Sequence, residues 1–265
     1  MKRALIVIDG NPNDRDSLNC AAEICRNNGA ALTVAAARLM PRAIGLFGGM
    51  IGGTDEPASE EEITAAAQAA YKESCGKLEN AEFIAYEAEG AEIIAAIGHA
   101  YDVVLVERIS REDGPEVDPL AAALFETGRP ALVTPPGRLR AFGRRIAVNW
   151  NGTVQVTRAI GSTMALLSRA EEVVLLLGSG MEAGPPLPIA DYMRVHGANV
   201  SVRRFDSDQM TARGRARALL GATSDAGADL LVTGAYGHGG EGYRSLGRAT
   251  QKVVSGAKIP VLLQS

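Results

Sequence analysis

The sequence has few of the residues that build disulfide frameworks, metal centres and nucleic-acid surfaces. Among 265 residues there are 3 cysteines, without C-x-x-C spacing, and 3 histidines that are scattered along the chain. This pattern excludes a disulfide framework and offers no ligand spacing for a metal ion. The formal net charge is -4, so the basic excess of a nucleic-acid-binding protein is missing as well. We therefore expect reduced thiols, no metal and no nucleic-acid partner.

Long hydrophobic runs are also absent. No stretch approaches the roughly 20 apolar residues that a membrane helix needs. The apolar run near the N-terminus, Ala4–Ile8, is followed by Asp9 and is too short for a secretion signal. We expect no membrane association and a cytoplasmic location.

What the chain does contain is a regular alternation of short β-branched runs and longer segments with helical periodicity. This alternation is typical of parallel strands joined by crossover helices. In the first half the pattern predicts strands at 4–8, 32–36, 82–86, 102–106 and 131–134, and helices at 14–27, 59–78, 90–99 and 119–125. In the second half it predicts strands at 145–149, 172–177, 199–204, 229–233 and 261–263, and helices at 154–168, 187–196, 211–226 and 248–255.

The two halves also share three short sequence landmarks in the same order. The matched pairs are Leu5–Gly10 with Ile146–Gly152, Tyr101–Val106 with Ala228–Thr233, and Gly128–Val133 with Ala257–Leu262. Repetition of this kind indicates an internal duplication.

The duplication divides the chain into two domains. The paired prolines Pro135 and Pro136 stop the last strand of the first half, and the basic residues that follow are typical of a solvated connection. We expect a first domain over 1–136, a linker over 137–143 and a second domain over 144–265. The fold class is α/β, with two tandem five-stranded parallel sheets, each doubly wound.

A glycine-rich segment follows the fourth strand of the second half and leads into a helix. It runs from Gly234 to Gly247, and Asn151-Gly152 follows the first strand of the same half. Ligands of open parallel sheets bind beyond the carboxyl ends of the strands, where the strand order reverses. Glycine lets a backbone approach an anion closely, and a helix N-terminus offers unpaired N–H groups. The segment therefore suits a phosphate-binding loop, with a plain surface loop as the alternative.

The spacing Gly234-x2-Gly237-x9-Gly247, together with Asn151-Gly152, resembles the universal stress protein (UspA-like) family. The resemblance implies the adenine-nucleotide alpha hydrolase-like fold, with the two copies packed as a pseudo-dimer through their last strands. It also implies binding of ATP or AMP, with or without magnesium, and a role in stress survival and signalling. A protein partner of unknown identity and a homodimer are further expectations.

Carried over by position, the family's binding residues fall in the second half. Gly234 and Gly237 would face the ribose and phosphates, and Gly247 would open the phosphate-binding helix terminus. Asn151 takes the place of an aspartate that helps to bind adenosine, and the backbone near Gly178 would lie by the adenine.

One departure concerns the residue after the last glycine, where the family usually has Ser or Thr and this chain has Arg248. A guanidinium can grip phosphate bidentately, or Arg248 can be a solvated residue of the first helical turn. Ala249 follows, and Thr250 is a candidate substitute hydroxyl. His238 in the loop is a candidate base for weak ATP hydrolysis, but no nucleophile or carboxylate is placed beside it, so we expect a binding protein and not an enzyme.

The first half lacks this loop. The positions that match the first two glycines hold Glu107 and Ser110, and the nearby Glu112 and Asp113 would repel a phosphate. Asp9 is retained and suits a turn before the first helix. We expect a degenerate first domain with a structural role, which leaves a scaffold that binds no nucleotide as the alternative function for the whole chain. The Gly-, Met- and Phe-containing segment 39–53 is expected to pack on its own domain, with a lid or a partner-docking loop as alternatives.

Overall fold

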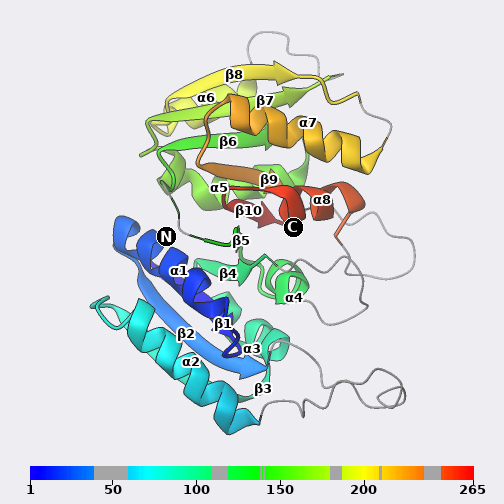
Figure 1. Cartoon of the computed structure of the whole chain (residues 1–265). Coiled ribbons are helices and arrows are strands. Elements are labelled where there is room, and N and C mark those ends of the chain that lie inside the picture. The colour runs from blue at the N-terminus through cyan, green and yellow to red at the C-terminus, as the bar shows by residue number, and fades with distance from the viewer. Residues whose placement is uncertain are drawn as a thin grey trace.

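The computed structural model describes residues 1–38, 59–108, 119–137, 139, 141–179, 187–208, 211–235 and 246–265. In these residues it shows one ten-stranded sheet with helices on both faces (Figure 1). The strands are β1 (Arg3–Ile8), β2 (Ala31–Arg38), β3 (Ala81–Glu89), β4 (Val103–Glu107), β5 (Ala131–Thr134), β6 (Arg145–Trp150), β7 (Glu172–Gly178), β8 (Val200–Phe205), β9 (Leu230–Gly234) and β10 (Val261–Gln264). The helices are α1 (Asp14–Asn28), α2 (Glu60–Ser74), α3 (Gly90–Ile97), α4 (Pro119–Phe125), α5 (Val154–Leu167), α6 (Pro188–Val195), α7 (Ala212–Asp225) and α8 (Arg248–Gly256).

The strand order is β3-β2-β1-β4-β5-β10-β9-β6-β7-β8. Each half therefore repeats the same five-stranded order, and all pairs within a half are parallel. The halves meet through the antiparallel pair β5 and β10, in which Leu132 lies opposite Leu262. This confirms the predicted tandem α/β fold and its packing through the last strands.

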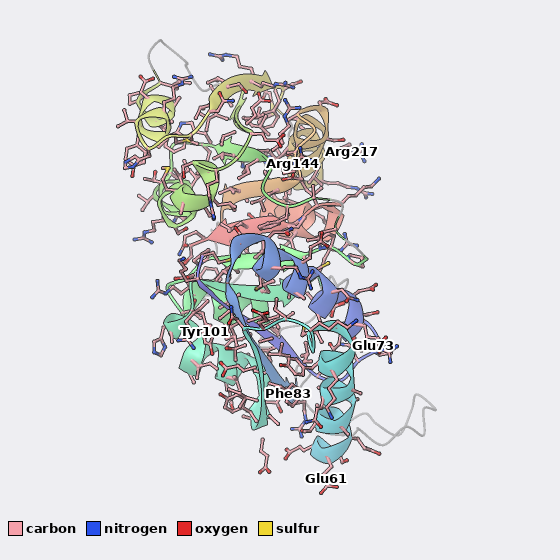
Figure 2. The ribbon with its side chains drawn as sticks, turned by 90° about the vertical axis from the view of Figure 1, so that its left-hand side faces the viewer. Glu61, Glu73, Phe83, Tyr101, Arg144 and Arg217 are labelled. Carbon is pink, nitrogen blue, oxygen red and sulfur yellow. The ribbon has the colours of Figure 1, made fainter. Side chains whose placement is uncertain are left out.

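Successive side chains of a strand point to opposite sides of the sheet, and helices cover both sides, so the central strands are buried on both faces. In β1, Ile6 and Ile8 belong to the hydrophobic cluster under α1, α2, α5 and α6, whereas Leu5 and Val7 belong to the cluster under α3, α4, α7 and α8. Side chains fill the space between the sheet and the helices (Figure 2). Each domain thus has a three-layer core, with two helices on either face of its half of the sheet.

Several element ends differ from those predicted, and the hydrogen bonds explain why. The helix expected over 59–78 begins after Ser59, whose hydroxyl accepts the Glu62 N–H at 3.2 Å while the Glu62 carboxylate accepts the Ser59 N–H at 2.8 Å. It ends at Ser74, because the chain turns back and the Leu78 N–H donates to the Cys75 carbonyl. The helix expected over 90–99 ends at Ile97 and continues as a 3₁₀ turn, Gly98–Ala100.

Cys20 and Cys25 on α1 and Cys75 at the end of α2 are free thiols, and all three are buried. Burial raises the pKa of Cys20 to about 11 and that of Cys25 and Cys75 to about 12, so these thiols are protonated at neutral pH. Among the described helices, none combines the length and apolar character needed to cross a membrane.

Candidate functional site

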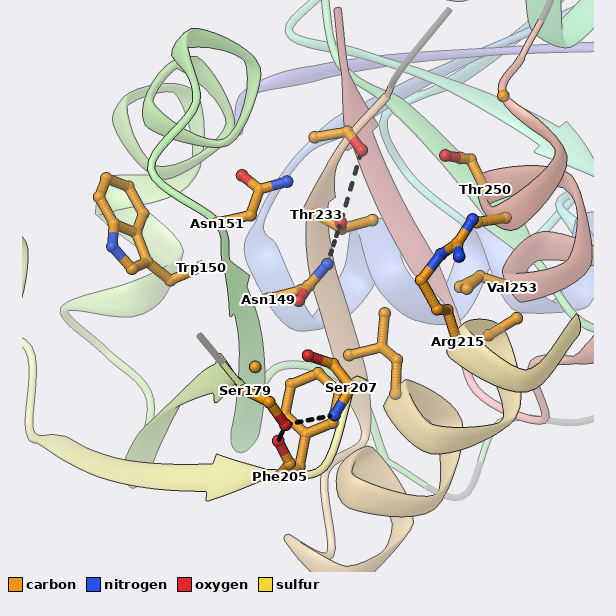
Figure 3. Close-up of a pocket in the computed structure, with 16 residues that line it drawn as sticks. Asn149, Trp150, Asn151, Ser179, Phe205, Ser207, Arg215, Thr233, Thr250 and Val253 are labelled. Atoms are coloured by element: carbon orange, nitrogen blue, oxygen red, sulfur yellow. Dashed lines mark hydrogen bonds between the residues drawn. The ribbon is translucent and has the colours of Figure 1, made fainter. Parts of the chain in front are cut away.

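A cavity of about 390 Å³ lies beyond the carboxyl ends of β6, β7, β8 and β9 in the second domain (Figure 3). Its wall is completed by α7 and by the first turns of α8. This position includes the gap between the first and fourth strands of the domain, where the strand order reverses and where the sequence predicts a ligand. The cavity also extends to the end of β7, at the expected residue Gly178, and further along the sheet than expected, to the end of β8.

The floor of the cavity is fixed by a hydrogen bond between its two central strands. The Asn149 side-chain amide on β6 donates to the Thr233 hydroxyl on β9 at 3.0 Å (Figure 3). After β6, the Asn151 side-chain oxygen accepts the backbone N–H and the hydroxyl of Thr153 at 3.3 and 2.7 Å. These bonds hold the turn in which Gly152 adopts a φ of 74°, a conformation that favours glycine.

Two glycines at the strand ends are required by close packing. A Cβ at Gly178 would collide with the Ser207 hydroxyl oxygen, so glycine lets the segment after β8 approach the end of β7. A Cβ at Gly234 would lie 2.8 Å from the Gln155 Cβ and 2.9 Å from the next backbone nitrogen of α5. The glycine at 234 therefore serves the approach of α5 to the sheet as well as the shape of the cavity.

The N-terminus of α8 forms one end of the cavity. Gly247 is the residue that precedes the helix and provides no side-chain cap. The half-buried residues Ala249 and Thr250 line the cavity, whereas Arg248 is exposed on the first turn and does not line it. The first N–H groups of a helix have no intrahelical partner and carry partial positive charge, so this end of the cavity favours an anion.

The charge of the described lining agrees with this preference. Arg215 on α7 is the one charged side chain among the described lining residues, and no carboxylate is found among them. Phe205, Leu219 and Val253 supply apolar surface. The cavity thus combines an apolar wall with a cationic side chain and a helix N-terminus.

The structure brings together six of the nine residues expected from sequence. Those that line the cavity are Asn151, Gly178, Gly234, Gly247, Ala249 and Thr250. Arg248 lies outside the lining, on the helix surface. Gly237 and His238 lie outside the described residues, as do Ser110, Glu112, Asp113 and the segment 39–53.

Sequence reasoning missed Phe205, Ser207 and Arg215. The rule that places ligands at strand ends could have identified Phe205 and Ser207, because they follow the strand predicted at 199–204. Arg215 carries no such signal, since it lies within a helix between two other arginines, Arg213 and Arg217.

The corresponding position in the first domain carries acidic groups. Asp9 follows β1, Glu107 ends β4, and Asp14 opens α1 with 1% of its surface exposed. The Asp14 carboxylate accepts the Gly10 N–H at 2.7 Å, and Asp9 accepts the Asn11 side-chain amide at 2.6 Å. Burial and then the charge of Asp9 raise the pKa of Asp14 to about 7, and the same two causes raise that of Glu107.

The fold and the cavity define a class: tandem α/β proteins with a cavity at the carboxyl ends of parallel strands. Solved structures of this fold include a universal stress protein from Archaeoglobus fulgidus DSM 4304, with a TM-score of 0.70 and 16% identity over 99% of this chain and 96% of that one. A putative universal stress protein from Pseudomonas aeruginosa UCBPP-PA14 gives a TM-score of 0.58, with 13% identity over 100% of this chain and 93% of that one. A functionally unknown protein from Pseudomonas aeruginosa PAO1 gives a TM-score of 0.56, with 13% identity over 100% of this chain and 92% of that one.

These likenesses confirm the universal stress protein fold that the sequence motifs predict. No protein-family model and no curated protein sequence matches the chain.

Proposed function

We propose that the second domain binds an adenine nucleotide, ATP or AMP, and that the chain acts in a stress response as a tandem universal stress protein. The observation that carries the proposal is the cavity itself. It lies at the reversal of strand order, it is bounded by the N-terminus of α8, and its described lining holds Arg215 and no carboxylate. The names of two structures of the same fold support the stress-response part.

The size and lining of the cavity suit such a ligand. Ligand sites are commonly about 300–1,000 Å³ with mostly apolar walls and a few polar groups, and this cavity has about 390 Å³. A planar base would contact Phe205 and Leu219, and phosphates would contact the N–H groups at the start of α8. Because no described lining residue is a carboxylate, a magnesium ion that accompanies ATP would be held by the phosphates and water.

We propose binding without catalysis. Among the described lining residues there is no carboxylate, histidine or cysteine that could act as a general base or nucleophile. The nucleotide would then act by stabilising one state of the protein, and the partner that reads this state is a protein of unknown identity.

The test is isothermal titration of ATP and of AMP, with magnesium, into protein stripped of copurifying ligand. The informative pair of variants is Ala249→Glu and Ala249→Gln, which are matched in size. A glutamate in the first turn favours the helix but places a negative charge at the anion-binding end of the cavity. We expect one site per chain in the wild type, retained in Ala249→Gln and weakened at least about tenfold in Ala249→Glu.

Absence of nucleotide binding to the wild type would contradict the proposal. It would favour the second candidate, an interaction scaffold with an empty site, which the exposed position of Arg248 and the acidic first domain make worth testing. If the chain is such a scaffold, millimolar nucleotide should leave its melting temperature unchanged.

A further inference from the structure

The sequence motif leaves the phosphate end of the cavity without its usual side chain. The residue after the last glycine is Arg248, and its side chain is exposed outside the lining. Thr250 supplies a hydroxyl but no charge. A cationic group does reach this cavity, however, from a part of the chain that the motif does not include.

We propose that Arg215, on α7, is the side chain that binds the phosphates, and that it makes the cavity selective for phosphorylated nucleotides over nucleosides. This inference rests on the proposed function, since it assigns a role within the same cavity.

The geometry of α7 supports the assignment. Arg215, Ala216 and Leu219 line the cavity from one face of the helix, and Ala216 and Leu219 are buried in the core. The helix is therefore anchored in the core directly after the point from which Arg215 projects. Its start is also fixed, because the Thr211 hydroxyl accepts the Gly214 N–H at 3.0 Å.

Helix α7 packs against α8, so the guanidinium and the helix N-terminus belong to one end of the cavity. Leu219 of α7 and Val253 of α8 belong to the same hydrophobic cluster. Figure 3 shows Arg215 extending from α7 toward the side of the cavity where Thr250 and Val253 lie. A guanidinium is always charged and its planar fork matches two phosphate oxygens, so Arg215 and the N–H groups of α8 can hold one phosphate group between them.

The distribution of charge along the chain draws an anion to this half. Residues 1–136 hold 22 of the 31 acidic residues and 11 lysines and arginines, whereas residues 144–265 hold 9 acidic residues and 14 lysines and arginines. The two halves thus have opposite net charge. The electrostatic potential of the positively charged second half raises the local concentration of an anionic ligand near it.

The test compares four ligands on three proteins by calorimetry. The ligands are ATP, AMP, adenosine and inorganic tripolyphosphate, and the proteins are the wild type, Arg215→Met and Arg217→Met. Arg217 is the matched control, because it is an exposed arginine two residues further along α7 and does not line the cavity (Figure 2). Methionine keeps the unbranched apolar stem and removes the charge.

We expect Arg215→Met to lower the affinity for ATP, AMP and tripolyphosphate by about tenfold or more. The affinity for adenosine should stay within about twofold, and Arg217→Met should bind all four ligands like the wild type. The loss of ATP affinity should shrink in high salt, since the contact is solvent-accessible.

Other results separate this inference from the proposed function. Undiminished ATP binding by Arg215→Met overturns the role of Arg215 and leaves nucleotide binding intact. An equal loss of adenosine and ATP affinity also overturns it, because the residue would then shape the cavity instead of binding phosphate. If the wild type binds tripolyphosphate through Arg215 but no nucleotide, the phosphate site stands and the proposed function fails. If the wild type binds none of the four ligands, both fail.

Discussion

Replacing Asp14 with asparagine should remove a specific pH dependence from the stability of the protein. Asp14 is buried at the start of α1, close to the charges of Asp9 and Glu107. A carboxylate near a helix N-terminus is ordinarily stabilised. At this position the cost of burial exceeds that benefit, so the pKa of Asp14 rises from 3.8 to about 7 in the folded protein.

The sign and size of the effect follow from linkage. Between pH 4 and 7 the folded protein binds a proton at Asp14 that the unfolded chain has released, so the free energy of unfolding falls as the pH rises. The contribution is fully present below about pH 4 and is lost above about pH 7. A shift from 3.8 to about 7 corresponds to about 4 kcal/mol. An asparagine cannot ionise, so Asp14→Asn should gain up to this amount relative to the wild type between pH 4 and 8.

The assay is urea unfolding of both proteins, followed by far-UV circular dichroism at half-unit steps from pH 4 to 8. Taking the difference between the two proteins cancels the titration of all groups that the substitution leaves unperturbed. Asp16→Asn is the control for loss of an acidic side chain, because Asp16 is an exposed acidic residue in the same helical turn. If the difference in free energy of unfolding between Asp14→Asn and the wild type did not change with pH, the reasoning would be refuted, because burial would then not raise the pKa of Asp14.

Four further substitutions test the packing around glycines and the cap of a helix. Gly10→Ala should destabilise by about 2–4 kcal/mol in urea unfolding, because Gly10 has a φ of 80° and a Cβ would lie 2.9 Å from a backbone oxygen of α2. Gly29 has a φ of 60° with open space around it, so Gly29→Ala should lower the free energy of unfolding by only about 1–2 kcal/mol. Equal losses of stability for Gly10→Ala and Gly29→Ala would contradict the steric argument. Gly234→Ala should push α5 from the sheet and lower both the melting temperature and nucleotide affinity, and an unchanged melting temperature would show that α5 yields freely. Ser59→Ala should cost about 1 kcal/mol through loss of the capping box, and no measurable change would mean that water replaces the cap.

The fold could be predicted almost completely from the alternation of apolar runs with helical periodicity. Runs such as Val103–Val106 are buried on both faces of the sheet, and a strand of that kind has a continuous apolar sequence. The element ends were less predictable, because they depend on local hydrogen bonds. The early end of α2 at Ser74, for example, depends on the turn that the Cys75 carbonyl forms with Leu78.

The candidate site could be predicted only where it follows strand ends or the glycine spacing. Asn151, Gly178 and Gly234 satisfy these local rules, and the structure places all three at the cavity. Arg215 could not be found in this way, because only the packing of α7 against α8 brings it to the cavity. Arg248 is close to the motif in sequence but does not line the cavity.

The antiparallel pairing of β5 with β10 has a consequence for how the two halves can diverge. In a homodimer of single domains, every substitution appears twice, once in each subunit, so both subunits must tolerate it. In this chain the partners across the central pair are encoded separately, although they share one sheet. One half can therefore accumulate acidic groups at its strand ends while the other keeps an open cavity. Because both halves belong to one polypeptide, they always occur in a one-to-one ratio.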